Sequence, residues 1–234
     1  MYKFKIIYLI LILFMYSPSS NSEDIEKHIE MLENYLRSIK NMSFTFEQYS
    51  PNKEKETGWM QIDKPDKLRI EYKGDNDLII ISNSAYLILY KAEDDIITSL
   101  PIEGPWSILT KSDLQFSSNK NDTDADGIIN NIKTLEINNI NHIFFEVLMR
   151  HQDTQLLSPI ILHASMKPFI LKGWTIFNDN NEGTKIKIIN NISLNESNIN
   201  ANIFRLSKKD RLAGNVWQGP FKKPQIIRQL KHRH

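Results

Sequence analysis

The sequence predicts a mainly β protein with few helices (an α+β fold), built on one curved antiparallel sheet. Apolar side chains alternate with polar ones along short segments, for example at Leu68, Ile70 and Tyr72, which is the pattern of a strand with one buried face. The polar pair Asn83-Ser84 separates two almost wholly apolar runs, which indicates a hairpin. Candidate strands recur about every 8 to 12 residues, the spacing of a β-barrel or a β-sandwich.

Composition limits the classes of function. The 234 residues suffice for one domain with a sizeable core. There is no cysteine, which excludes disulfides, thiolate metal sites and the lipid-bearing cysteine of a bacterial lipoprotein. Residues 207–234 carry a net charge of +7, whereas residues 23–206 carry −8. A body of that charge argues against nucleic acid as a partner.

Residues 1–22 are typical of a secretory signal peptide. Lys3 and Lys5 precede an apolar run over 6–15, and Ser20-Asn21-Ser22 fits a cleavage site. The alternative is a membrane anchor, but a span needs about 20 apolar residues and this run has about half as many. We therefore expect an exported mature chain.

The mature chain opens with the clearest helix, over Glu23–Lys40. Its apolar residues are spaced by three and four, which places them in one stripe. They are Ile25, Ile29, Leu32, Leu36 and Ile39. Ser22 can cap this helix. The stripe fits a helix packed on an ordinary core and equally a lid over an open sheet, so the helix alone does not decide between them.

Strands are expected through most of the remaining chain. In order, they are 42–49, 56–63, 67–73, 77–82, 85–91, 95–100, 131–138, 142–149, 159–165, 172–178 and 184–192. Pro101 and Pro105 bracket a break, after which a short helix over 106–109 is expected with proline at its first turn. Residues 111–130 are expected to form a polar loop, and Phe204 closes the ordered part.

The sequence contains no motif for a catalytic or metal site. The segment Asp122–Gly127 is similar to the start of a calcium-binding loop, but the position that needs a bidentate glutamate is Lys133, so we expect a solvated acidic loop. His142, Glu146 and Asp153 could be placed together, but without a motif we expect surface or strand-end side chains. No cofactor and no metal is expected, and the protein is not expected to be an enzyme.

Several pieces of the sequence together resemble the LolA family, the periplasmic outer-membrane lipoprotein carriers of Gram-negative bacteria. The resemblance covers about residues 25–205, and it rests on order and spacing because no single piece is specific. The pieces are the first helix with Phe44-x-Phe46-Glu47-Gln48, Gly58-Trp59, Lys64-Pro65-x-Lys67-Leu68-Arg69-x-Glu71-Tyr72, Leu87-Ile88-Leu89-Tyr90 and Pro168-Phe169-x-Leu171-x-Gly173-Trp174-Thr175.

The resemblance implies an unclosed β-barrel, or half-barrel, of about 10 to 11 antiparallel strands under a helical lid, in a domain over 23–206. Its apolar cavity would hold the acyl chains of a lipoprotein. The carrier would collect that cargo from an inner-membrane lipoprotein-releasing ABC transporter and pass it to an outer-membrane receptor or to the outer membrane itself. It would be a monomer in the periplasm.

Ten side chains are candidates for this site. The cavity candidates are Phe44, Phe46, Leu68, Ile70, Tyr72 and Ile88, and the lid candidates are Leu32, Leu36, Trp106 and Leu109. We expect the inner wall to be left unfilled by the protein's own side chains. Plain core is the alternative for each, since alternation shows that a face is buried and not that it is hollow.

The resemblance also implies a lid-locking position directly before the strand-opening proline. The family has arginine there and this chain has Lys64. Arginine offers a planar fork of donors and lysine a single mobile charge. We therefore expect a lock that is weaker or built differently.

Two other functions compete with the carrier. One is a related half-barrel sensor that binds a lipidated signal and regulates a partner. The other is a lipid esterase, but no nucleophile stands beside a base in the sequence.

The tail over 207–234, with eight Lys and Arg residues around Trp217 and Phe221, could attract anionic lipid. Docking on the acidic body or a solvated end are the alternatives for the tail.

Overall fold

The computed structural model describes residues 20–52, 54–73, 78–83, 86–91, 96–102, 104–151, 157–178 and 180–206. The expected signal peptide, up to residue 19, and the basic tail lie outside them. The elements are α2 (Ser20–Ser38), β1 (Asn41–Tyr49), β2 (Lys55–Asp63), β3 (Lys67–Lys73), β4 (Leu78–Asn83), β5 (Tyr86–Lys91), β6 (Ile96–Pro101), η1 (Gly104–Trp106), α3 (Ser107–Thr110), β7 (Phe116–Ser117), β8 (Gly127–Ile137), β9 (Ile140–Arg150), β10 (Leu157–Met166), β11 (Phe169–Phe177), β12 (Gly183–Leu194) and η2 (Ala201–Phe204).

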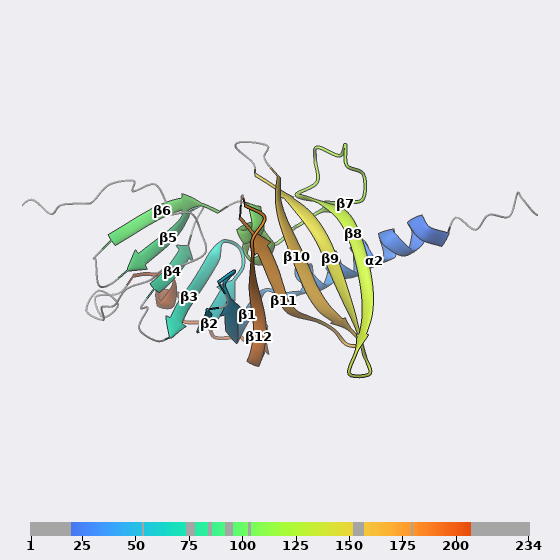
Figure 1. Ribbon diagram of the computed structural model, residues 1–234. Helices are drawn as coiled ribbons and strands as arrows, with labels where there is room; N and C mark the ends of the chain where they lie inside the picture. Colours follow the sequence, from blue (N-terminus) through green and yellow to red (C-terminus); the bar gives the residue numbers. More distant parts are fainter. Residues whose placement is uncertain are drawn as a thin grey trace, which may run out of the picture.

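The strands form one sheet in the order β6-β5-β4-β3-β2-β1-β12-β11-β10-β9-β8-β7 (Figure 1). Neighbours are antiparallel except β7 and β8, which are parallel. The first and last long strands, β1 and β12, pair at the centre, so the two halves of the chain build the two halves of the sheet. The edges, β6 and β7, do not pair with each other. The predicted fold class, a mainly β protein with an unclosed antiparallel sheet and few helices, is confirmed.

One part of the predicted strand list is wrong. The expected polar loop over 111–130 contains β7, and β8 begins at Gly127 rather than at residue 131. Phe116 and Gly127 pair in this short parallel ladder. A strand of two residues is too short to produce a periodic signal, which is why the sequence did not indicate it. The expected hairpin at Asn83-Ser84 joins β4 to β5 as predicted, although residues 84 and 85 lie outside the described residues.

The sheet has an inner face, which α2 and α3 cover, and an outer face. One cluster of buried hydrophobic side chains takes in α2, α3 and every strand except β6, whose Leu100 packs against it partly buried. In Figure 1, α2 passes behind β9, β10 and β11, and α3 lies near the middle of the sheet. Because successive side chains of a strand point to opposite faces, the alternation of the sequence decides which residues α2 meets.

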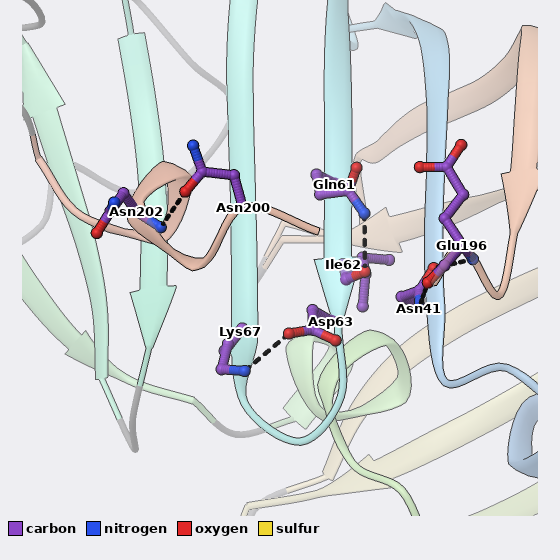
Figure 2. A network of polar contacts seen from close by, with 8 residues as sticks. All are labelled: Asn41, Gln61, Ile62, Asp63, Lys67, Glu196, Asn200 and Asn202. Carbon is purple, nitrogen blue, oxygen red and sulfur yellow. Dashed lines mark hydrogen bonds and ion pairs between the residues drawn. The ribbon is translucent and has the colours of Figure 1, made fainter. Parts of the chain in front are cut away.

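The segment after β12 returns across the outer side of the sheet. Asn41 and Glu196 exchange two hydrogen bonds, at 3.0 and 2.8 Å, and Asn200 caps η2 by accepting from the main chain of Asn202 at 3.0 Å (Figure 2). Phe204 is buried at the end of η2. The described chain thus ends beside β3 and β4, on the face away from α2.

Candidate functional site

The predicted cavity wall is brought together on the inner face, with one exception. Phe44, Phe46, Leu68, Ile70 and Tyr72 all belong to the buried inner cluster. The strand register explains this, since Phe44 pairs with Met60 and Ile70 also pairs with Met60 from the other side. Three adjacent strands therefore present one continuous apolar surface.

Ile88 does not share that surface. It is half-buried, whereas its neighbours Leu87 and Leu89 belong to the inner cluster. Ile88 pairs with Ile81, which lies in a separate cluster on the outer face with Ile79 and Tyr90. Leu87 and Leu89 therefore hold the inner positions of β5 that the sequence analysis gave to Ile88.

The four lid candidates all lie against the inner face. Leu32, Leu36 and Leu109 are buried in the inner cluster, and Trp106 packs against it partly buried. Ile29 completes the buried stripe of α2, so the helix covers the sheet through successive turns. The 19-residue helix starts at Ser20 and ends at Ser38, two or three residues before each expected boundary.

The inner face is covered by apolar side chains in this structure. Phe44, Phe46, Leu68 and Ile70 are each 0 to 1% exposed, so no water-sized space borders these four side chains. The expectation of a wall left unfilled therefore does not describe these positions with α2 in place. A guest could reach them only if α2 or α3 moved.

The turn between β2 and β3 holds both helices. The Lys64 ammonium donates to the main-chain oxygen of Leu36 in the last full turn of α2, with a distance of 2.8 Å between Nζ and oxygen. The main-chain N–H of Asp66 donates to the oxygen of Thr110 in α3 at 3.0 Å. A cation is favourable at a helix C-terminus, where unpaired carbonyls and the helix dipole leave negative charge.

Burial disfavours the charged form of the Lys64 side chain in this position. Burial lowers its pKa to about 8, and the nearby Asp113 carboxylate opposes this shift. Near neutral pH the side chain is still mainly charged, and its charge strengthens the hydrogen bond to Leu36. The residue at the expected lid-locking position thus touches the helix through one donor rather than through a fork.

Two further hydrogen bonds fasten α2 to the sheet. The hydroxyl of Tyr35 accepts from the main-chain N–H of Leu171 at 3.2 Å, and burial raises the pKa of that hydroxyl. The Glu33 carboxylate accepts from the main-chain N–H of Phe116 at 2.7 Å. Both acceptors belong to α2 and both donors to the sheet, so these bonds tie the helix to β11 and β7.

A buried polar chain lies at the end of the predicted wall. The Tyr72 hydroxyl donates to Gln48 Oε1 at 2.8 Å, and Gln48 Nε2 donates to Glu56 Oε2 at 2.9 Å. Burial raises the pKa of Tyr72, so its hydroxyl stays protonated and remains a donor. Each buried polar atom needs such a partner, and the chain leads from the apolar face to the surface.

A polar pocket of about 300 Å³ lies on the outer face, away from α2. Its wall includes Trp59, Arg69, Glu71, Ile203 and Arg205. Arg69 is buried and donates to Glu71 and, at 2.9 Å, to the main-chain oxygen of Ile203. The Arg69–Glu71 pair and the bond from Arg69 to Ile203 hold η2 on the sheet, so this pocket is a different kind of site from the apolar inner face.

The acidic loop before β8 uses its carboxylates in local contacts. Asp122 accepts from the main-chain N–H groups of Asp124 and Ala125, which lowers its pKa. Asp126 accepts from Lys111 Nζ at 2.8 Å and from the main chain of Gln115. Among the described residues, no group of three or more His, Cys, Asp or Glu side chains could hold a metal ion.

The structure brings His142 next to a second histidine, His163, rather than next to Glu146. His142 Nδ1 lies 2.8 Å from His163 Nε2 on the outer face, and the Phe144 ring stacks on His163. Glu146 instead meets Asn131, and Asp153 lies outside the described residues. Only the pairing of β9 with β10 creates this neighbourhood, so no local signal in the sequence could have indicated it.

None of the helices in the described part of the chain is long and apolar enough to cross a membrane. No curated protein matches the chain. The solved structures that are similar include an uncharacterized conserved protein from Thermus thermophilus (9% identity, 80% of this chain and 96% of that chain, TM-score 0.47) and a LolA superfamily protein from Nitrosomonas europaea (6% identity, 76% of this chain and 97% of that chain, TM-score 0.41).

The model of one protein family, described as outer membrane lipoprotein carrier protein LolA, matches residues 37–207. That range starts in the last turns of α2 and ends just after η2. It includes the whole sheet and the turn that carries Lys64. Because the match extends over most of the sequence, this chain belongs to the LolA family.

Proposed function

We propose that this protein carries lipoproteins by shielding their acyl chains on the inner face of the sheet. The observation that supports this most directly is a continuous apolar face, built by both halves of the chain, whose cover is a single amphipathic helix and one short helix. Phe44 and Leu68 from one half and Phe145 and Leu162 from the other are buried in the same cluster. Such a face suits alkyl chains, which make no directed contacts.

In the proposed mechanism, α2 and the acyl chains compete for the same surface. The apolar contacts of Ile29, Leu32 and Leu36 with the sheet are of the kind that methylene groups can replace. Burying one CH₂ group is worth about 0.8 kcal/mol, so a few methylenes match one leucine side chain. The exchange is then close to balanced, which lets the carrier both load and release its cargo.

Hydrogen bonds between α2 and the sheet then set the balance. Two of these bonds form only with α2 in place. Tyr35 of α2 accepts from the main chain of Leu171 in the sheet, and Lys64 donates to the main chain of Leu36 in α2. A typical net contribution is about 1 kcal/mol each. If only the open form binds, the apparent affinity is proportional to its population. Weakening one such bond should therefore raise the affinity for acyl chains.

The most direct test is native mass spectrometry of the protein purified without detergent, followed by titration with a fluorescent acylated peptide. We expect a bound lipid or lipoprotein, and saturable binding of the peptide. We expect Tyr35→Phe to bind the peptide about fivefold more tightly, because about 1 kcal/mol corresponds to that factor. Tyr49→Phe is the matched control, since Tyr49 donates to Glu47 away from α2. Absence of binding by both forms would refute the carrier function.

The setting of this function follows from the family and from the expected signal peptide over 1–22. We place the protein in the periplasm, with an inner-membrane lipoprotein-releasing ABC transporter as donor and an outer-membrane receptor or the outer membrane as acceptor. Purification of the mature chain with its N-terminus intact, and sequencing of that N-terminus, tests export: a start near Glu23 supports it and a start at Met1 contradicts it.

A further inference from the structure

The hairpin of β8 and β9 exposes three large aliphatic side chains at its end. Leu135 is 41% exposed, Ile137 40% and Ile140 48%. Ile137 pairs with Ile140, and Leu135 pairs with His142, so the three lie together on the outer face. Glu136, between two of them, points to the other face because successive side chains alternate. The cluster is therefore uninterrupted by charge.

This end of the hairpin extends past its neighbour. β10 pairs with β9 only as far as His142 with Ser165, and the turn begins three residues further on, at Asn139 and Asn138. In Figure 1 the turn projects beyond the ends of β10 and β11 at the lower edge of the sheet. A projecting tip, rather than a groove, presents these side chains.

Lysines lie on the outer face near the tip and, across β9, β10 and β11, on β12, although residues 23–206 carry a net charge of −8. Lys133 lies on the same face of β8 as Leu135, and Lys185 and Lys187 are exposed on the outer side of β12. Burial is the main cause that lowers the pKa of His163, on the same face, to about 4, and the charges of His142, Lys185 and Lys172 add to it.

We propose that the β8–β9 tip, together with the lysines of the outer face, is a contact surface for an anionic lipid bilayer. Leu135, Ile137 and Ile140 enter the headgroup region, and Lys133, Lys185 and Lys187 face the lipid phosphates. An apolar tip beside lysines is the combination that binds anionic interfaces, through buried apolar area and through attraction of each base to the surface. This contact goes beyond acyl-chain carriage and does not depend on cargo.

The size of the tip favours lipid over a protein partner. A stable protein interface buries about 800 Å² on each side, and three side chains that are each less than half exposed present only a small part of that. A bilayer needs no complementary shape, and each inserted side chain gains transfer free energy independently. The free edge of β8 beside the tip could instead pair with a second copy, and the test separates these cases.

The chain has no cysteine, so a single introduced cysteine reports on one site. The full chain with Ile137→Cys, labelled with an environment-sensitive fluorophore, is mixed with vesicles of phosphatidylglycerol and phosphatidylethanolamine. We expect a blue shift that is absent with neutral phosphatidylcholine vesicles. Leu157→Cys is the matched control, because Leu157 is 43% exposed at the opposite end of the strands, and we expect no shift there.

Co-sedimentation with the same vesicles gives the second measurement. The triple variant Leu135→Ser, Ile137→Ser, Ile140→Ser should bind the vesicles at least about tenfold more weakly than the wild-type protein. The control Leu157→Ser should bind them like the wild type. Both variants should have the same thermal unfolding midpoint as the wild-type protein, since exposed positions contribute little to stability.

Three outcomes would overturn the proposal. The first is unchanged binding by the triple variant together with lost binding on removal of 207–234, which would assign lipid binding to the tail. The second is a blue shift of the fluorophore at position 157 that equals the blue shift at position 137. The third is a dimer without vesicles that the triple variant abolishes, which would make the tip a self-association surface.

Discussion

Lys64 gives the sharpest test of how the helical cover is held. Its pKa is 10.5 in a solvated lysine and about 8 in the folded protein, where burial is the main cause. Between these values the unfolded chain binds more protons than the folded one, so the free energy of unfolding rises with pH in that window. From about pH 7 to about pH 9.5 the rise from this one group is about 1 to 2 kcal/mol, the lower figure allowing for partial contact with water.

The assay is urea unfolding of the wild type, Lys64→Met and Lys64→Arg at both pH values. Methionine has no charge and arginine keeps its charge in this range, so neither variant should show the rise. The difference in unfolding free energy between wild type and each variant isolates Lys64 from the other titrating groups. A difference that stays constant with pH would refute the reasoning, because it would mean that water reaches the ammonium and that the contact with Leu36 is not buried.

Three other predictions concern the inner face; urea unfolding checks the first two, and titration with the acylated peptide checks the third. Tyr72→Phe leaves buried Gln48 without its donor and should cost about 1 to 3 kcal/mol, while Tyr49→Phe should cost little; equal effects would contradict the buried chain. Gly58→Ala places a Cβ 2.7 Å from a main-chain oxygen of β3 and should destabilise by about 1 to 3 kcal/mol; an unchanged midpoint would contradict this close packing. Leu68→Glu should abolish acyl-peptide binding while the sheet persists, because the carboxylate reaches water when α2 lifts; a fully unfolded variant would show that the cover does not move.

Alternation in the sequence was enough to predict the inner face where one face of a strand is apolar and the other polar. Leu68 and Ile70 alternate with Arg69 and Glu71, and both leucine and isoleucine are buried inside. The method failed at Ile88 because the run Leu87–Tyr90 is apolar on both faces. The outer cluster with Ile81 buries the second face of β5. In a strand that is buried on both faces, apolar and polar residues do not alternate, so the sequence does not indicate which residues point inward.

Contacts between distant segments depend on strand order, which local patterns do not contain. The separation of 28 positions between Leu36 and Lys64 gave no reason to place them together; only the resemblance to the LolA family predicted a lid contact there. The same limit applies to His142 and His163, which are diagonal neighbours across the pair of β9 and β10. The pairing of β7 with β8 was also beyond a periodicity argument, since the ladder has only two residue pairs.

In the proposed opening of the cover, the junction after α2 indicates which end of the helix moves. The Asn195 side chain accepts from the main-chain N–H of Lys40 at 2.7 Å and donates to the oxygen of Ser38 at 3.0 Å, so it clamps the link between α2 and β1. Lys64 holds Leu36 just before this clamp. Towards the other end, α2 is tied through carboxylates, including Glu26, which accepts from the Ser118 hydroxyl at 2.6 Å. A helix clamped at its C-terminus can only swing out from its N-terminal end. In that motion Ile29 leaves the sheet before Leu36 does, so acyl chains would enter first beneath the early turns of α2, which lie on the β7 side of the inner face.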